Sequence, residues 1–459
     1  MRKVFLFGID GASPELIFDK WINKLPHIKK LMANGIYGQL NSTIPPVTII
    51  AWNAMLSGKD PSEIGVFSYT FQDENGKSQL ASSKNVSCNL IWDILGEKNK
   101  KTISLYVPLT FPVKPINGCM ISGFLSPGIN SNCAYPKSLK NKLKLLKKPE
   151  LFFDVAVGLA SHKALGTKTL LKRTYEMTDM QIKIIKELIV EKKWDVFITV
   201  MIGTDRLQHM LWRHFDPKHR RFIKNSPHKN ALKEYYIYLD KKLGEILALL
   251  DKDTDILIVS DHGMIRQEGK ININNWLIKE GYLVLKVKPR QGEKQRFDLN
   301  LVDMDKTLVY ATGAYHARIF INKKKISNGY EEFKKELIEK LKNIPDDRGR
   351  KLDTKIYATK DIYKDNSSPE CPDLIIYFDN LKWASNPDLG QKGLYSWESA
   401  VGADSAGHST KGIFILNSKN ITKRGKIKDV DIQQITPTIL KLLNLEIPKE
   451  IEYKPIGNK

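Results

Sequence analysis

The sequence predicts an α/β fold in which helices cover a mostly parallel central sheet. The first observation is a set of short apolar runs, each typical of a strand buried on both faces: Val4–Ile9, Trp194–Met201 and Asp255–Val259. The second is that longer segments of helical periodicity lie between such runs, for example Leu170–Val190 and Ala231–Leu250. The third is that acidic and histidine side chains follow the apolar runs directly.

Strands and helices alternate through the first part of the chain, which is the order expected for parallel strands joined by helical crossovers. Paired prolines make residues 43–51 a predicted loop. In chain order we expect the strand Val4–Ile9, the helix Leu25–Met32, the loop Thr43–Ala51 leading into a helix through Trp52–Leu56, a helix beginning at Asn89–Leu95 and the strand Thr102–Val107. The helix Leu170–Val190, the strand Trp194–Met201, the helix Ala231–Leu250 and the strand Asp255–Val259 follow.

The whole chain, residues 1–459, is predicted to be one catalytic domain with inserted segments. Residues 125–170 are rich in proline and lysine and have weak periodicity, which indicates an excursion from the sheet. Residues 265–400 are of mixed pattern and are the second predicted insertion, so both are expected to form cap elements. They are expected to include the strands Tyr315–Ile321 and Leu374–Tyr377 and the helix Tyr330–Leu341; the strand Gly412–Leu416 and the helix Thr438–Leu443 follow.

Composition places the chain among soluble globular proteins, with 42% hydrophobic and 27% charged residues. No apolar run approaches the roughly 18 residues that a membrane span needs. The N-terminal apolar run is too short for a signal peptide and leads into Asp10, so the expected location is cytoplasmic. Reduced thiols are expected there, and no paired spacing suggests metal binding by Cys88, Cys119, Cys133 and Cys371.

The formal net charge is +22. Lysine clusters such as Lys137–Lys148 and Lys323–Lys325 carry much of it, without a basic repeat interleaved with aromatic residues. We therefore expect no dedicated nucleic-acid partner. A positive surface also attracts small anionic substrates. The sequence does not indicate the oligomeric state.

Metal-type ligands follow the ends of several predicted strands. Asp205 and His209 are four residues apart, so a helix would place both on one face. Asp261 and His262 can reach one site only if the strand stops before them, which Gly263 permits. Six carboxylate and imidazole ligands are too many for one zinc ion but suit two. They are Asp10, Asp205, His209, Asp261, His262 and His408.

Thr48 is the predicted nucleophile. Pro45 and Pro46 fix the approach of the chain, and a helix is expected directly after Thr48. A hydroxyl held by a metal ion loses its proton readily, and a helix N-terminus stabilises the resulting anion. Ser42 and Thr43 lie close by, and their spacing leaves them as alternatives.

The ordered motifs resemble those of the type I phosphodiesterase/nucleotide pyrophosphatase family of the alkaline phosphatase superfamily. The resemblance spans nearly the whole chain and implies an alkaline phosphatase-like three-layer sandwich. The motifs are Gly8-Ile9-Asp10-Gly11, Pro45-Pro46-Val47-Thr48 with Ala51-Trp52, Met55-Leu56-Ser57-Gly58-Lys59-Asp60-Pro61, Gly203-Thr204-Asp205 with His209, Ser260-Asp261-His262-Gly263-Met264 and Gly407-His408.

The resemblance also implies a ligand set and a mechanism. One divalent ion would be held by Asp205, His209 and His408, and a second by Asp10, Thr48, Asp261 and His262. Thr48 would form a covalent phospho-threonine intermediate during hydrolysis of a phosphodiester or phosphoanhydride. Zinc is the expected metal, and manganese is the alternative because carboxylate-rich sites accept both. The expected substrate is a small anionic phosphodiester or nucleotide.

The chain departs from the family pattern near the substrate. Similar enzymes read Pro-Gly-x-His-Gly where this chain has Pro61-Ser62-Glu63-Ile64-Gly65. An asparagine that helps hold the phosphoryl oxygen has no clear counterpart; Ser68 and Tyr69 lie near its place, and Asn53 is the predicted substrate-binding residue.

Two other functions stay open from the sequence. A phosphomonoesterase, phosphonate hydrolase or phosphoglycerate mutase of the same superfamily would use a similar site. A non-catalytic basic binding protein on the same fold is the alternative from a different class.

Overall fold

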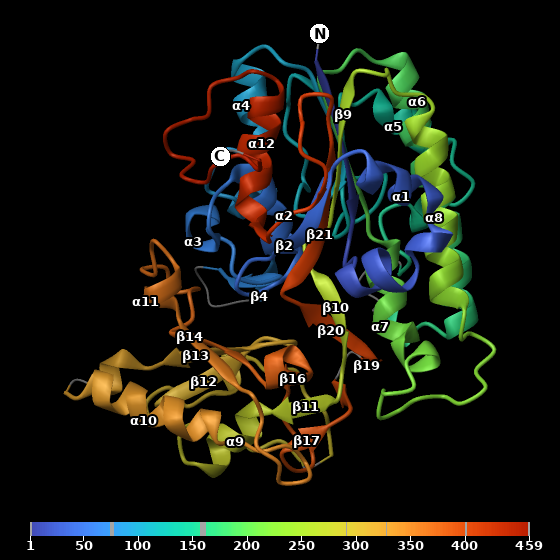
Figure 1. The fold of residues 1–459 in the computed structure, drawn as a ribbon. Helices are drawn as coiled ribbons and strands as arrows, with labels where there is room; N and C mark the ends of the chain where they lie inside the picture. Colours follow the sequence, from blue (N-terminus) through green and yellow to red (C-terminus); the bar gives the residue numbers. More distant parts are fainter. Residues whose placement is uncertain are drawn as a thin grey trace.

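The computed structural model describes residues 2–73, 78–156, 162–290, 292–326, 328–399 and 402–457. Its centre is a large sheet with helices on both faces (Figure 1). The strands of this sheet lie in the order β22-β2-β21-β9-β1-β8-β5-β6-β7, with β23 beside β2.

The middle of the sheet is parallel. β1 (Lys3–Ile9) lies between β8 (Val196–Met201) and β9 (Thr254–Val259), parallel to both. Beyond β8 the sheet continues in parallel with β5 (Thr102–Val107) and β6 (Gly118–Ser122). β5 and β8 are buried along their whole length, as their apolar sequences predict.

Both ends of the sheet contain antiparallel pairs. β21 (Lys411–Asn417) runs antiparallel to β9, and β2 (Ile36–Asn41) antiparallel to β21. β2 escaped the sequence prediction because buried and half-buried residues alternate along its six positions, so it has no continuous apolar run. The remaining edge strands are β7 (Ala134–Tyr135), β22 (Gly425–Lys426) and β23 (Val430–Asp431).

Helices form a layer on each face of this sheet, which gives three layers (Figure 1). One layer contains α1 (Pro26–Ala33), α5 (Leu139–Lys144), α6 (Thr167–Glu191), α7 (Gly203–Phe215) and α8 (Ala231–Leu247). The other contains α2 (Thr48–Ser57), α3 (Pro61–Ile64), α4 (Ile91–Glu97) and α12 (Ile435–Leu442).

The predicted loop over residues 43–51 was wrong in its second half, because α2 begins at Thr48. The carbonyl of Val47 already accepts the N–H groups of Ile50 and Ala51. The two prolines restrict the chain only before Val47, so helical hydrogen bonding can begin immediately after it. This places Thr48 at the N-terminus of a buried helix.

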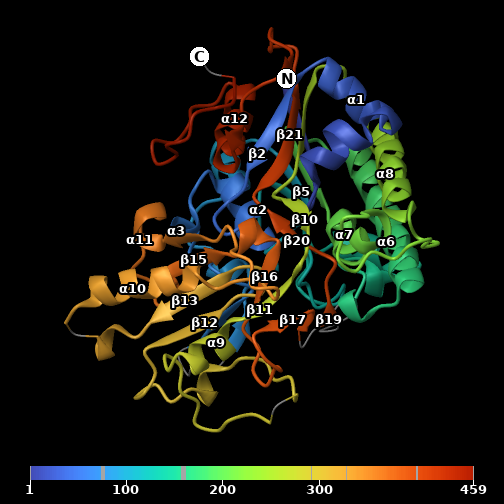
Figure 2. The same cartoon turned by 60° about the horizontal axis from the view of Figure 1, so that its bottom comes forward.

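A second lobe lies between β10 (Gly263–Arg266) and β20 (Ala406–Ser409), which pair antiparallel (Figure 2). Among the described residues it has its own cluster of buried apolar side chains. Its larger sheet has the order β12 (Val309–Thr312), β13 (Ala317–Ile321), β15 (Leu374–Tyr377), β14 (Lys355–Ala358). Its smaller sheet has the order β16 (Trp383–Asn386), β11 (Gly269–Asn272), β17 (Tyr395–Ser396). The other elements of the lobe are α9 (Ile273–Lys279), α10 (Tyr330–Lys342), α11 (Thr359–Ile362), β18 (Glu398–Ser399) and β19 (Gly402–Ala403). Outside the lobe, β3 (Thr70–Gln72) and β4 (Ser78–Leu80) form an antiparallel hairpin.

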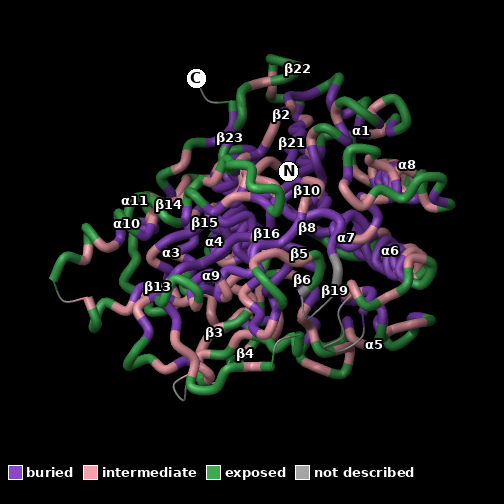
Figure 3. The backbone as a smooth tube through the Cα atoms, turned by 90° about the horizontal axis from the view of Figure 1, so that it is seen from below, coloured by how far each residue is buried: buried purple, intermediate pink, exposed green. Residues whose placement is uncertain are grey.

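Buried residues follow the central strands and the inner sides of the helices, and exposed residues gather at the periphery (Figure 3). The largest apolar cluster joins the sheet to both helical layers. Within the described part of the chain, no helix combines the length and apolar character that crossing a membrane requires.

The indole of Trp52, from α2, packs so closely against β1 that position 8 has room only for a glycine. A Cβ atom built on Gly8 would lie 2.3 Å from Cη2 of that indole. We expect Gly8→Ala to lower the free energy of unfolding by about 1–3 kcal/mol, because overpacking forces the indole or the strand to move. Urea unfolding monitored by circular dichroism measures this. Gly166→Ala is the matched control, since no atom of the described residues lies within 4 Å of its Cβ position, and an equal loss there would contradict the packing argument.

Candidate active site

Three adjacent strands deliver most of the predicted ligands to one edge of the sheet. Asp10 follows β1, Asp205 and His209 lie on α7 after β8, and Asp261 and His262 follow β9. Because β9, β1 and β8 are parallel neighbours, their carboxyl ends meet. The main chain ties the ends together, since the Gly11 N–H donates to Asp261 Oδ1 at 3.2 Å.

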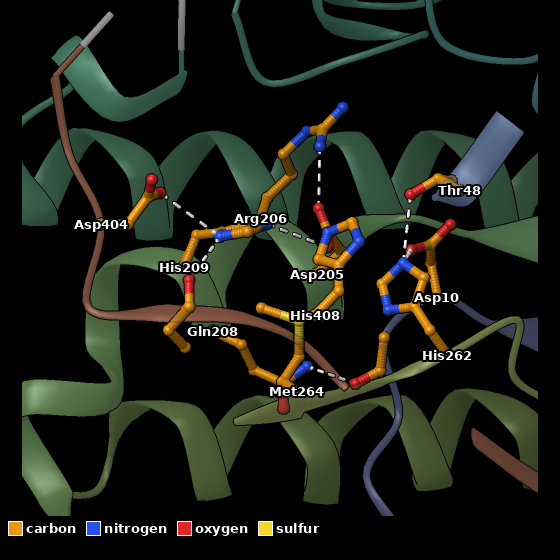
Figure 4. A network of polar contacts seen from close by, with 12 residues as sticks. Asp10, Thr48, Asp205, Arg206, Gln208, His209, His262, Met264, Asp404 and His408 are labelled. Atoms are coloured by element: carbon orange, nitrogen blue, oxygen red, sulfur yellow. Dashed lines mark hydrogen bonds and ion pairs between the residues drawn. The ribbon is translucent and has the colours of Figure 1, made fainter. Parts of the chain in front are cut away.

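His408 and Thr48 reach the same point from the other side. His408 lies on β20, opposite Met264 of β10, so its pairing with the strand that follows β9 carries it to the site. The Nδ1 of His408 donates to the carbonyl oxygen of Pro46 at 2.7 Å, which fixes the loop before Thr48. Figure 4 shows Thr48, His262 and Asp10 close together beside His408 and Asp205. All seven predicted side chains are at most 2% exposed.

Each of the three histidines donates through Nδ1 to a main-chain carbonyl. His209 donates to Ala406 at 2.9 Å and His262 to Gly263 at 3.0 Å, in the manner of His408. A carbonyl oxygen can only accept, so the proton of a neutral ring lies on Nδ1. The lone pair of Nε2 therefore faces the interior of the cluster, which is the arrangement found in metal-binding histidines.

The carboxylates face those lone pairs. Asp205 Oδ1 lies 3.2 Å from Nε2 of His209 and 3.5 Å from Nε2 of His408. Asp261 Oδ2 lies 3.1 Å from Nε2 of His262. Both of these oxygens, and Oδ1 of Asp10, are buried and have no hydrogen-bond partner among the described residues. Acceptors facing acceptors in a buried site are costly unless a cation lies between them.

The geometry therefore fits metal ions. Two groups of three residues have ligand atoms that all lie within 4.8 Å of one another inside the group. One is Asp205 with His209 and His408, and the other is Asp10 with Asp205 and His262. Asp205 belongs to both groups, which places it between the two candidate positions. Asp261 joins the second group through its contact with His262.

Burial and crowding shift the pKa values of these groups. The pKa of Asp10 is raised well above its ordinary value by burial and by the nearby charge of Asp205. Burial also favours the neutral form of Asp205, but His209, His408 and Arg206 hold its pKa well below the ordinary range. Burial lowers the pKa of His209, yet Asp205 and Asp404 together raise it to about 9.

Thr48 Oγ1 lies 3.2 Å from Nε2 of His262, whose lone pair accepts the hydroxyl proton. Thr43 is one of the competing hydroxyls. It donates to the carbonyl of Pro45 at 2.6 Å, so it stabilises the loop before Thr48. The side chain of Asn53 donates to the carbonyls of Ile49 and Pro108, at 2.7 and 3.4 Å. These contacts lie within the fold, and the predicted substrate-binding role of Asn53 stays a prediction.

Several residues that the sequence did not indicate support the ligands. Asp404 Oδ1 lies 3.4 Å from Nδ1 of His209, and its other oxygen binds Lys163 and Lys270. Tyr315, from the second lobe, stacks on His408 with ring centroids 4.5 Å apart. No sequence spacing marks Asp404 or Tyr315.

Trp52 could have been found from the sequence, since it lies one helical turn after Thr48. Its indole N–H donates to Asp10 Oδ2 at 2.9 Å. We expect Trp52→Phe to weaken metal binding about 10- to 100-fold, as loss of a partner to a ligand commonly does. Competition with a chromogenic chelator measures the affinity. Trp92→Phe is the control, because the Trp92 indole nitrogen is buried without a hydrogen-bond partner among the described residues and lies outside the site. Equal losses in both variants would contradict the proposed support of Asp10.

Comparison with solved structures identifies the fold. The chain is similar to murine ectonucleotide pyrophosphatase/phosphodiesterase 5, solved as an inactive variant in complex with AMP, with a TM-score of 0.57 and 13% identity over 98% of this chain and 96% of that one. The human protein of the same name gives a TM-score of 0.55 and 14% identity over 97% and 96%. At such identities the likeness establishes the fold, which is alkaline phosphatase-like as the sequence predicted.

Comparison with protein families identifies the chain. A search of curated proteins gives no match. The sequence model described as type I phosphodiesterase/nucleotide pyrophosphatase matches residues 4–404, which contain seven of the eight predicted site residues. The chain therefore belongs to the type I phosphodiesterase/nucleotide pyrophosphatase family and is a hydrolase acting on phosphoester bonds.

Proposed function

We propose that this protein hydrolyses phosphodiester or phosphoanhydride bonds of small anionic substrates through a covalent intermediate on Thr48, at a site that holds two zinc ions. The observation that carries the proposal is the buried cluster of unpaired carboxylate oxygens and histidine lone pairs beside the Thr48 hydroxyl. Nucleotides are the proposed substrate class, which family membership and the AMP complex of the murine relative support.

The reaction has two displacements at phosphorus. In the first, Thr48 Oγ1 forms a bond to phosphorus as the bond to one ester oxygen breaks, and that oxygen leaves as an alcohol after taking a proton. In the second, water attacks phosphorus and the bond to Thr48 breaks, which returns the hydroxyl and releases the phosphate monoester. Splitting the reaction in this way replaces one difficult step by two easier ones.

The chain supplies the position and the environment of the nucleophile. Thr48 is the first residue of α2, so its oxyanion lies at the positive end of the helix dipole. His262 Nε2 orients the hydroxyl. The surrounding residues exclude water, which strengthens every electrostatic contact in the site.

Two ligand sets are proposed for the metals. Asp205, His209 and His408 would hold one ion, and Asp10, Thr48, Asp261 and His262 the other. When bound, such ions lower the pKa of a coordinated hydroxyl or water and neutralise charge on the phosphoryl oxygens. Mixed carboxylate and imidazole donors fit zinc, and manganese is the alternative.

The test is a comparison of bis(p-nitrophenyl) phosphate with p-nitrophenyl phosphate as substrates of the zinc-loaded protein. We expect kcat/KM for the diester to exceed that for the monoester by about 10-fold or more, since the expected specificity rests on binding the second ester group. Both reactions release p-nitrophenol and are read by absorbance. A preference for the monoester would contradict the proposal and favour a phosphomonoesterase.

A further inference from the structure

A pocket of about 850 Å³ lies beside the candidate active site. This size is typical of pockets that enclose a small organic molecule. Its apolar lining comes from the β4 hairpin and from two segments, residues 124–131 and 149–156. The apolar side chains are Leu80, Phe124, Leu125, Ile129, Phe153 and Ala156.

Arg206 connects this pocket to the metal-type ligands. Its side chain lines the pocket, and its Nη1 donates to Asp205 Oδ2 at 2.8 Å (Figure 4). The same guanidinium forms two hydrogen bonds, of 3.0 and 2.9 Å, to Asp154 in the pocket wall. It also lies 4.9 Å from the centre of the Phe124 ring. A group that enters the pocket therefore stops one side chain away from Asp205.

Tyr69 makes the same connection on the nucleophile's side. Its ring packs edge-on against Phe124, with centroids 6.1 Å apart. Burial raises the pKa of the Tyr69 phenol well above the ordinary value, and the Thr48 side chain lies close enough to lower it. Tyr69 therefore lies between Phe124 of the pocket wall and the Thr48 side chain.

Three of the polar side chains that line the pocket are already used within the protein, and Asn130, Glu150 and Arg296 complete its polar lining. Ser126 donates to the carbonyl of Gly123 and Ser131 to that of Gly128, each at 2.6 Å. Asp154 is held by Arg206. A nucleobase would need hydrogen-bond partners for its edge, whereas an alkyl or aryl group needs only the apolar surface that the lining offers.

We propose that this pocket binds an apolar alkyl or aryl ester group of the substrate, so that the phosphoryl group reaches Thr48 with an apolar substituent in the pocket. The proposal rests on the proposed function and specifies one ester group of its diester substrates, which would be apolar where a nucleotide carries a nucleoside.

The experiment measures binding of octylphosphonate and methylphosphonate to the zinc-loaded protein by calorimetry. Neither compound can be hydrolysed, because the C–P bond replaces the ester. We expect octylphosphonate to bind at least about 100-fold more tightly, since each buried methylene adds roughly a fourfold gain and burial of about three to four of the roughly seven extra methylenes gives this ratio. Ile129→Asp should reduce this ratio about tenfold and Leu80→Asp about threefold, because each puts a charge on the apolar lining. Leu145→Asp is the control, since this leucine is 81% exposed and does not line the pocket.

A ratio near one for the native protein, or a ratio unchanged in Ile129→Asp, would overturn the proposal. So would AMP binding more tightly than octylphosphonate and losing that affinity in Ile129→Asp, because the pocket would then hold a nucleoside. Chain-length-dependent binding without hydrolysis of any diester would support the pocket and contradict the proposed function. Hydrolysis of diesters, together with phosphonate binding that does not depend on chain length, would support the proposed function and contradict the pocket's proposed role.

Discussion

Thr48→Ala is expected to lower kcat for bis(p-nitrophenyl) phosphate by about 10⁴-fold or more, as loss of a nucleophile does in other covalent hydrolases. The physical reason is the position of Oγ1, which lies at the N-terminus of α2 and 3.2 Å from His262. Rapid acid quenching followed by mass spectrometry should find a phosphoester adduct on the peptide that contains Thr48. The adduct should be absent from the variant.

Ser42→Ala is the matched control for this experiment. The Ser42 hydroxyl is also buried near the site, and it has no hydrogen-bond partner among the described residues. Its removal should leave kcat within about twofold, because it takes no part in the cluster. An adduct on Ser42, or activity retained by Thr48→Ala, would show that the nucleophile had been assigned to the wrong residue.

Removal of the metals is expected to abolish activity and to destabilise the fold. Dialysis against a chelator should lower kcat/KM at least about 1,000-fold, and two equivalents of zinc should restore it. The melting temperature should fall by about 5 °C or more, because ligand binding at a thousandfold excess over Kd stabilises by roughly 4 kcal/mol per site. The structural cause is one buried oxygen on each of Asp10, Asp205 and Asp261 that has no hydrogen-bond partner in the part of the chain that the structure describes. Scanning calorimetry and metal analysis of the same samples measure both effects.

His408→Ala and His228→Ala provide a paired comparison for the metal experiment. The first removes a proposed ligand and should lower the zinc content from two to about one per chain. The second removes a half-buried histidine outside the site and should leave two. Full activity in a chain stripped of metal would contradict a metal-dependent mechanism altogether.

The sequence allowed most of the site to be predicted because its ligands follow strands that the sequence marks clearly. β1, β8 and β9 are continuous apolar runs, and Asp10, Asp205 and Asp261 come at or just after their ends. Parallel neighbours bring such ends together without further information. The lengths of α6 and α8 also follow from helical periodicity.

Other features depend on contacts between segments far apart in the chain. Asp404 contacts His209 across 195 positions of sequence, and Tyr315 stacks on His408 from a separate lobe. β2 joins the sheet only by pairing with β21, which comes hundreds of residues later. Local periodicity carries no signal for such contacts, since each residue's own neighbours in sequence permit many other partners.

The sequence by itself determined the α/β class, the parallel centre of the sheet and the chemical types of the seven candidate residues. Those properties follow from local patterns: apolar runs, helical spacing and polar residues at strand ends. The tertiary structure alone decided how the ligands face one another, which main-chain carbonyls orient the histidines, and where an apolar pocket opens beside Arg206. These depend on packing between segments that only the folded chain brings together.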